Sequence, residues 1–148
     1  MKVIEYFNAE NKELWLSKIA ASDWGAGQYL AYLIKENKLF DLVGKAKMLM
    51  LIDDENLVSF CTLAEKDDVQ PTDLTPWIGW IYTFPAYRGK RLAGELLSNA
   101  EELAKQGGAT HTYISTNHIG LYEKYGYEFF TMAKDVEGED TRVYRKKL

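Results

Sequence analysis

Residues 77–94 read WIGWIYTFPAYRGKRLAG, and this stretch decides the expected fold. Its first seven residues are mostly aromatic or β-branched, which predicts a buried strand. Pro85 ends the strand because proline cannot donate to a strand ladder. A basic turn follows, and a helix is expected from about Arg91. Apolar residues recur on one face of that helix, at Leu92, Leu96, Leu97, Ala100, Leu103 and Ala104.

The junction between this strand and this helix has the features of an anion-binding site. The first N–H groups of a helix have no partner within the helix, and the helix dipole favours negative charge there. The turn adds the cationic side chains of Arg88, Lys90 and Arg91. We therefore interpret residues 88–94 as a cradle for a pyrophosphate. A turn that only caps the helix and a small RNA-binding patch are the alternatives.

The composition is that of one globular, acidic domain. A chain of 148 residues can bury a full core, and 47% hydrophobic with 27% charged residues excludes a disordered or fibrous protein. The net charge of −4 argues against general binding of nucleic acid or anionic membranes and is compatible with a cationic substrate. Cys61 is the only cysteine, which excludes an internal disulfide and a cysteine-rich metal site. We expect no metal cofactor.

The beginning of the chain does not resemble a signal peptide. Lys2 and Glu5 place charges where the apolar region of such a peptide would begin, and no apolar run approaches membrane length. We therefore expect a cytoplasmic protein with neither a membrane nor a nucleic acid as partner.

Hydrophobic periodicity and turn residues predict an alternation of helices and strands. Strands are expected at residues 2–7, 47–52, 57–65, 77–83, 110–116, 127–133 and 141–146. Helices are expected after Asn8 or Asn11, over residues 28–37, from about residue 91 to 106, and over residues 119–125. This order predicts an α/β (α+β) fold, with a mixed, mostly antiparallel sheet flanked by helices, in one domain spanning residues 1–148.

The element order and the basic turn resemble the GNAT superfamily of N-acetyltransferases. The acyl-CoA loop of that family has the pattern Gln/Arg-x-x-Gly-x-Gly/Ala, and residues 88–93 here read RGKRLA. The first and sixth positions match, but Arg91 stands where the family usually has glycine. That glycine lets the backbone approach the phosphates closely. Arg91 either replaces close approach with charge or weakens binding, and the sequence leaves both outcomes open.

This resemblance implies acetyl-CoA as a co-substrate and assigns the residues that would hold it. Backbone groups of Ile81, Tyr82 and Thr83 would pair with the pantetheine amides. The pyrophosphate would be bound by Arg88, Gly89, Lys90, Arg91, Leu92, Ala93 and Gly94.

A second stretch, NHIGLYEKYGY at residues 117–127, resembles the family's Leu-Tyr-Glu-Lys-x-Gly-Phe segment. The resemblance places Tyr122 beside the cofactor sulfur, where a phenol with a reference pKa of about 10 can donate a proton to the leaving thiolate. Packing on a helix face is the alternative role for this tyrosine. The resemblance also assigns Asn117 to the cofactor, although the family usually has two more residues between this asparagine and the tyrosine.

A general base is the least defined part of the expected site. Many family members carry a carboxylate on the strand at residues 77–83, and none is present here. His118 follows a strand end and is a candidate because histidine titrates near neutral pH, with a capping or solvent-facing role as the alternative. Deprotonating an amine with a pKa of about 10.4 at pH 7 costs about 4.6 kcal/mol, against about 1.4 kcal/mol for a pKa near 8. A site without a strong base favours the second kind of amine or deprotonation through water.

Aromatic residues are the candidates for the acceptor side. Trp24, Tyr29 and Trp80 are expected to line this pocket, although core packing accounts for each one singly. The resemblance places the loop between the first two helices, which contains Trp24, beside the acceptor. We therefore expect an acyl-CoA-dependent N-acyltransferase that moves acetyl to a primary amine of a small molecule or peptide by direct attack. A non-catalytic acyl-CoA or nucleotide-binding module is the alternative, and a homodimer is left open.

Overall fold

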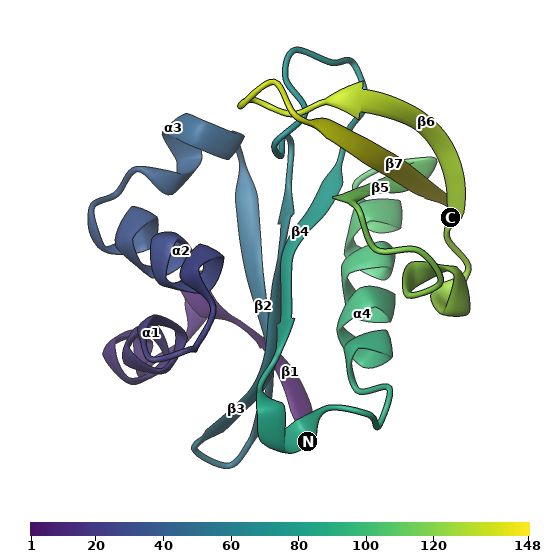
Figure 1. The fold of residues 1–148 in the computed structure, drawn as a ribbon. Coiled ribbons are helices and arrows are strands. Elements are labelled where there is room, and N and C mark those ends of the chain that lie inside the picture. Colours follow the sequence, from purple (N-terminus) through teal and green to yellow (C-terminus); the bar gives the residue numbers. More distant parts are fainter.

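The aromatic run at residues 77–83 forms the central strand of a seven-stranded sheet in the computed structural model, which describes residues 1–148 (Figure 1). The strands are β1 (Lys2–Glu5), β2 (Ala46–Asp53), β3 (Asn56–Ala64), β4 (Trp77–Thr83), β5 (His111–Thr116), β6 (Glu128–Lys134) and β7 (Asp140–Lys147), in the order β1-β2-β3-β4-β5-β7-β6. The helices are α1 (Lys12–Ala20), α2 (Gly25–Lys35), α3 (Leu39–Val43) and α4 (Ala93–Gln106), with 3-10 turns η1 (Tyr6–Asn8), η2 (Pro85–Tyr87) and η3 (Tyr122–Tyr125). The predicted mixed, mostly antiparallel sheet is confirmed.

Two hydrophobic cores lie on opposite faces of the sheet. Helices α1, α2 and α3 cover one face, and α4 covers the other (Figure 1). Successive side chains of β2 point to opposite faces of the sheet and so belong to different cores. Met48 and Met50 face α1 and α2, while Leu49 and Leu51 face α4. The face of α4 predicted from its periodicity is the buried one. No helix combines the length and apolarity needed to cross a bilayer.

The sheet opens between its only parallel pair of strands. Strands β4 and β5 are paired at one position, Trp77 with Tyr113, whereas every other neighbouring pair is antiparallel and longer. Beyond Trp77 the two strands separate, so the β5 side of β4 has no strand partner. An unpaired strand edge in the middle of a sheet offers backbone donors and acceptors to a ligand.

A β-bulge changes the direction of side chains along β4. Gly79 is opposite Thr62 and Tyr82 is opposite Phe60, so two residues of β4 face one residue of β3. Trp80, within this bulge, has φ of +46°. The bulge places both Trp80 and Tyr82 on the α1–α2 face of the sheet.

The boundaries of some helices differ from the predictions in segments where the hydrophobic periodicity of the sequence is weak. Helix α2 begins at Gly25 rather than at residue 28. Its first turn contains two glycines, and Gly27 is needed for packing, since a Cβ there would lie 2.7 Å from the Ser22 Oγ. The five-residue α3 was not predicted because it is too short to show helical periodicity. The helix expected at residues 119–125 is only the turn η3, and α4 begins at Ala93 rather than at Arg91.

Candidate functional site

A cavity of about 600 Å³ lies where β4 and β5 separate. It receives side chains from the α1–α2 region, β4, β5, η3, the loop between β3 and β4, and the turn between β6 and β7. Its aromatic lining is Trp24, Tyr29, Trp80 and Tyr122, and its other ionisable lining is Asp67, Asp68, His118 and Glu137. Segments far apart in the sequence therefore meet in one pocket of the size typical for small ligands.

The three aromatic residues predicted for the acceptor side line this cavity together. The indole of Trp24 stacks on Tyr82, with ring centroids 5.4 Å apart and planes 5° apart. The Trp80 Nε1–H donates to the carbonyl oxygen of Ala26 at 2.7 Å, which ties the bulge of β4 to α2. Tyr29 remains 49% exposed, so the aromatic wall is open to ligands at its outer end.

Tyr122 lies in η3 and also lines the cavity. Its side chain is buried, and this burial raises the pKa of Tyr122 to about 12, with no hydrogen bond contributing to the shift. The phenol is therefore protonated throughout the neutral range. The turn that carries it is held against the start of α4, because Gly94 allows the ring of Tyr125 to approach where a Cβ would lie 2.9 Å away.

The open edge of β4 presents alternate residues to the gap. The Phe84 N–H donates to the carbonyl of Val58 on β3, so Tyr82, two residues earlier, also directs its backbone toward β3. Ile81 and Thr83 consequently face the gap, as expected for residues that would pair with pantetheine. Tyr82 instead contributes its ring to the α1–α2 face, where its hydroxyl hydrogen-bonds the Asp23 carboxylate.

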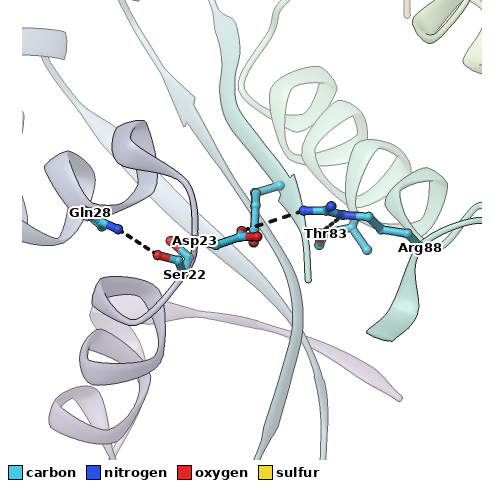
Figure 2. Close-up of polar contacts among 6 residues, drawn as sticks. Ser22, Asp23, Gln28, Thr83 and Arg88 are labelled. Atoms are coloured by element: carbon cyan, nitrogen blue, oxygen red, sulfur yellow. Dashed lines mark hydrogen bonds and ion pairs between the residues drawn. The ribbon is translucent and has the colours of Figure 1, made fainter. Parts of the chain in front are cut away.

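Arg88, predicted to bind phosphate, reaches across the end of β4 (Figure 2). Its Nε–H donates to the Thr83 carbonyl at 2.9 Å, and its guanidinium lies 4.0 Å from the Asp23 Oδ1 and 5.3 Å from the Tyr82 ring centroid. Both charged side chains are more than half exposed, so the ion pair contributes little free energy. Its effect is positional, because it links the α1–α2 turn to the loop before α4.

The loop before α4 forms the expected cradle of backbone donors. The N–H groups of residues 89–93 have no hydrogen-bond partner in the chain, whereas the Gly94 N–H donates to the Arg91 carbonyl at 3.1 Å. Gly89 and Arg91 both have left-handed backbone, with φ of +81° and +56°. Such turns gather successive N–H groups around an anion, and the helix dipole adds to the effect. The free N–H groups of this cradle suit the pyrophosphate of coenzyme A. The Gly94 N–H is already used within the chain, and the predicted contact of Gly94 with the cofactor stays a prediction.

Replacing Arg91 with glycine is expected to stabilise the fold. A left-handed conformation costs a residue with a side chain about 1–2 kcal/mol, and glycine offsets part of that gain through the entropy of the unfolded chain. We expect the free energy of unfolding in urea to rise by about 0.5–1 kcal/mol.

Arg91→Ala is the matched control, because it removes the charge but keeps the left-handed strain. Equal weakening of coenzyme A binding in both variants would assign Arg91 a role through charge. A glycine variant no more stable than the alanine variant would contradict the assignment of strain to this position.

Asn117 and His118 lie at the edge of the site. The Asn117 Nδ2 donates to the Asp140 carbonyl at 3.4 Å, and the exposed side chain does not line the cavity. His118 does line the cavity, but its side chain is exposed at the rim. Their predicted contacts with cofactor and substrate stay predictions.

Two carboxylates that the sequence analysis did not single out enter the cavity from the loop at residues 65–76. The Asp67 Oδ1 occupies the space that a Cβ on residue 79 would need, so the carboxylate lies directly against β4. Burial, reinforced by the neighbouring charge of Asp68, raises the pKa of Asp67 to about 7. The Asp68 Oδ1 is buried with no hydrogen-bond partner. The sequence signal was Gly79, because glycine inside a strand often marks close approach of another group.

No group of three or more histidine, cysteine, aspartate or glutamate side chains is arranged to hold a metal ion.

Comparison with known proteins places this site in a family. A model described as the acetyltransferase (GNAT) family matches residues 7–127. No curated protein sequence matches the chain.

Solved structures share the fold over nearly the whole chain. An acyl-CoA N-acyltransferase from Pseudomonas aeruginosa is 24% identical, with a TM-score of 0.65 and coverage of 98% of this chain and 97% of that one. An aminoglycoside 6'-N-acetyltransferase from Enterococcus faecium is 11% identical, with a TM-score of 0.71 and coverage of 99% and 97%. A GNAT family acetyltransferase from Elizabethkingia anophelis with acetyl-CoA bound is 14% identical, with a TM-score of 0.68 and coverage of 99% and 97%.

The family model spans most of the chain, including β4, the cradle and η3. It confirms the predicted family, reaction class and co-substrate. The chain belongs to the GNAT family of acetyltransferases and is an acetyl-CoA-dependent N-acetyltransferase.

Proposed function

We propose that this enzyme acetylates a primary amine of a small molecule by direct attack on the thioester, without a covalent enzyme intermediate. One observation carries the proposal. A single cavity extends from the aromatic wall of Trp24, Tyr29 and Trp80 to Tyr122, beside the open edge of β4. An amine at the wall and a thioester along that edge would share one pocket, which favours reaction through proximity.

Two parts of the protein would bind acetyl-CoA: the loop before α4 and the open edge of β4. The free N–H groups of residues 89–93 would hold the pyrophosphate, and the exposed cations Lys90 and Arg91 would add charge. Ile81 and Thr83 would hydrogen-bond the pantetheine along the β4 edge. The bound co-substrate supplies an activated acetyl group, and the protein supplies alignment.

Tyr122 would stabilise the departing sulfur. Its pKa of about 12 exceeds the thiol reference of about 8.5, so complete proton transfer to the thiolate would be uphill by about 5 kcal/mol. Donation of a hydrogen bond carries no such cost and strengthens as negative charge develops on sulfur. Tyr122 thus acts as a hydrogen-bond donor to the leaving group, and the hydroxyl keeps its proton throughout the reaction.

The acceptor is proposed to be a small cationic amine rather than a peptide. The cavity volume of about 600 Å³ suits a small molecule, and the acceptor side carries aromatic faces that attract cations. Two solved structures of the same fold are named as aminoglycoside 6'-N-acetyltransferases, which is consistent with a small-molecule amine. The peptide acceptor that the sequence left open is therefore the alternative outcome of the test below, and a homodimer stays a prediction.

The proposal is tested by acetyl-CoA turnover over a panel of diamines, polyamines, aminoglycosides and short peptides, measured as thiol release. We expect turnover with at least one small amine and a higher kcat/KM for small amines than for peptides. Calorimetry with coenzyme A provides the parallel measurement of binding. Binding without turnover of any amine would favour the non-catalytic module, and preferred peptide turnover would overturn the small-molecule assignment.

A further inference from the structure

We propose that Asp67 is the base that takes a proton from the acceptor amine, and that Asp68 holds the ammonium form of that amine beside it. This inference rests on the proposed function, because it concerns the acceptor half of the same cavity. It assigns the base to the loop between β3 and β4.

The position of Asp67 is set by contact with the strand that carries the reaction edge. Its carboxylate oxygen fills the space above Gly79, one residue before the bulge at Trp80. Both Asp67 and Gly79 line the cavity shared with Tyr122. The Asp67 carboxylate therefore lies in the cavity directly against β4, although Asp67 itself belongs to the β3–β4 loop.

Hydrogen bonds hold the backbone at both aspartates. The Gln70 Nε2 donates to the Asp67 carbonyl at 2.7 Å within the loop, and the carbonyl of Asp68 accepts from the Val136 N–H at 2.8 Å, which ties the loop to the β6–β7 turn. An aspartate has only a short side chain, so a held backbone keeps both carboxylates beside the cavity, although rotation about χ1 can still turn them.

The ionisable groups around Asp67 favour a cationic ligand. Asp68 from the same loop, Glu137 from the β6–β7 turn and His118 after β5 line the cavity, together with the phenols of Tyr29 and Tyr122. No lysine or arginine lines it. The buried Asp68 Oδ1 lacks a partner, and a buried carboxylate oxygen left unpaired is costly. An ammonium group would supply the missing donor and the opposite charge.

The proton balance of the step is complete with these groups. The ammonium form of the acceptor, R–NH₃⁺, gives one proton to the Asp67 carboxylate, and the freed nitrogen lone pair forms a C–N bond to the thioester carbonyl carbon. The C–S bond then breaks with its electron pair on sulfur, while Tyr122 hydrogen-bonds that sulfur. The second nitrogen proton neutralises the thiolate, and Asp67 releases its proton to water after product leaves.

The ionisation of Asp67 gives the inference a pH signature. Burial and the charge of Asp68 raise the pKa of Asp67 to about 7, so the carboxylate form needed for catalysis disappears as the pH falls below neutrality. We expect an acid limb in kcat/KM near pH 7. Asp67→Asn is expected to lower kcat/KM at pH 8 by about 100-fold and to remove that limb.

Asp68→Asn tests the second half of the inference. Removing its charge should lower the pKa of Asp67 and move the acid limb to lower pH, while raising KM for the cationic acceptor. Asp73→Asn is the matched control, because Asp73 belongs to the same loop but is exposed and does not line the cavity. Its rate and pH profile should equal those of the wild type.

Thermal unfolding separates loss of the base from loss of the fold. The folded pKa of Asp67 lies above its value in the unfolded chain, so the ionised carboxylate destabilises the fold above about pH 7, and this penalty vanishes by about pH 4. Asp67→Asn should therefore raise Tm at pH 8 and leave it nearly unchanged at pH 4.

An acid limb that survives in Asp67→Asn and disappears in His118→Ala would overturn the inference, as would full activity of Asp67→Asn. If the wild type acetylates no amine, the proposed function fails instead, before any variant is compared.

Discussion

Replacing Tyr122 with phenylalanine is expected to lower kcat about 100-fold while leaving coenzyme A binding nearly unchanged. The substitution removes only the hydroxyl and keeps the buried ring, so it creates almost no cavity in the packing around η3. The lost group is needed when charge appears on sulfur, and not when the cofactor tail binds the cradle before α4. A hydrogen bond formed mainly in the transition state affects kcat rather than affinity.

The measurement is steady-state thiol release with the best acceptor, combined with calorimetric titration of coenzyme A. Tyr125→Phe is the matched control, because Tyr125 lies in the same turn but packs its ring on Gly94 and does not line the cavity. We expect it to retain nearly the wild-type kcat. Equal losses in both variants would show that η3 tolerates no change, and an undiminished kcat in Tyr122→Phe would contradict the role of the phenol.

The parts of the site that are local in sequence could be predicted. The strand at residues 77–83, the basic turn and the amphipathic α4 follow one another in the chain, so their periodicity and turn residues are sufficient to place the cradle. Arg91, the departure from the family pattern, has a left-handed backbone, a conformation that glycine adopts without strain.

The parts that depend on long-range packing could not be predicted. The loop at residues 65–76 carries no periodic signal, and its carboxylates enter the cavity only because that loop folds back over β4. The contact of Arg88 with Asp23 joins residues 65 positions apart through an exposed pair that no local pattern encodes. Strand β4 itself carries no carboxylate, whereas the fold brings the Asp67 carboxylate to β4 from the preceding loop.

Gly79→Ala is expected to lower kcat/KM about as far as Asp67→Asn, about 100-fold, without changing any charge. The new Cβ would occupy the space that the Asp67 Oδ1 fills, and the carboxylate is the flexible partner in this contact. Gly79 has an ordinary strand conformation, so alanine is compatible with its backbone. The substitution thus moves the proposed base away from β4 while the strand stays in register.

The measurement is kcat/KM against pH, together with thermal unfolding at pH 8. Gly25→Ala is the matched control, because a Cβ on Gly25 meets no atom within 4 Å and should leave kcat/KM and its pH profile unchanged. Gly25 belongs to α2, so this alanine should raise Tm slightly rather than lower it. A displaced Asp67 carboxylate would be better hydrated, so its pKa would fall and any remaining acid limb would move to lower pH. The same displacement exposes the buried charge of Asp67 to water, which raises Tm at pH 8. This gain offsets the loss of Tm that the crowded alanine Cβ causes. If Gly79→Ala keeps the wild-type rate and pH profile, Asp67 is not the base, because the rate would then not depend on the position of its carboxylate.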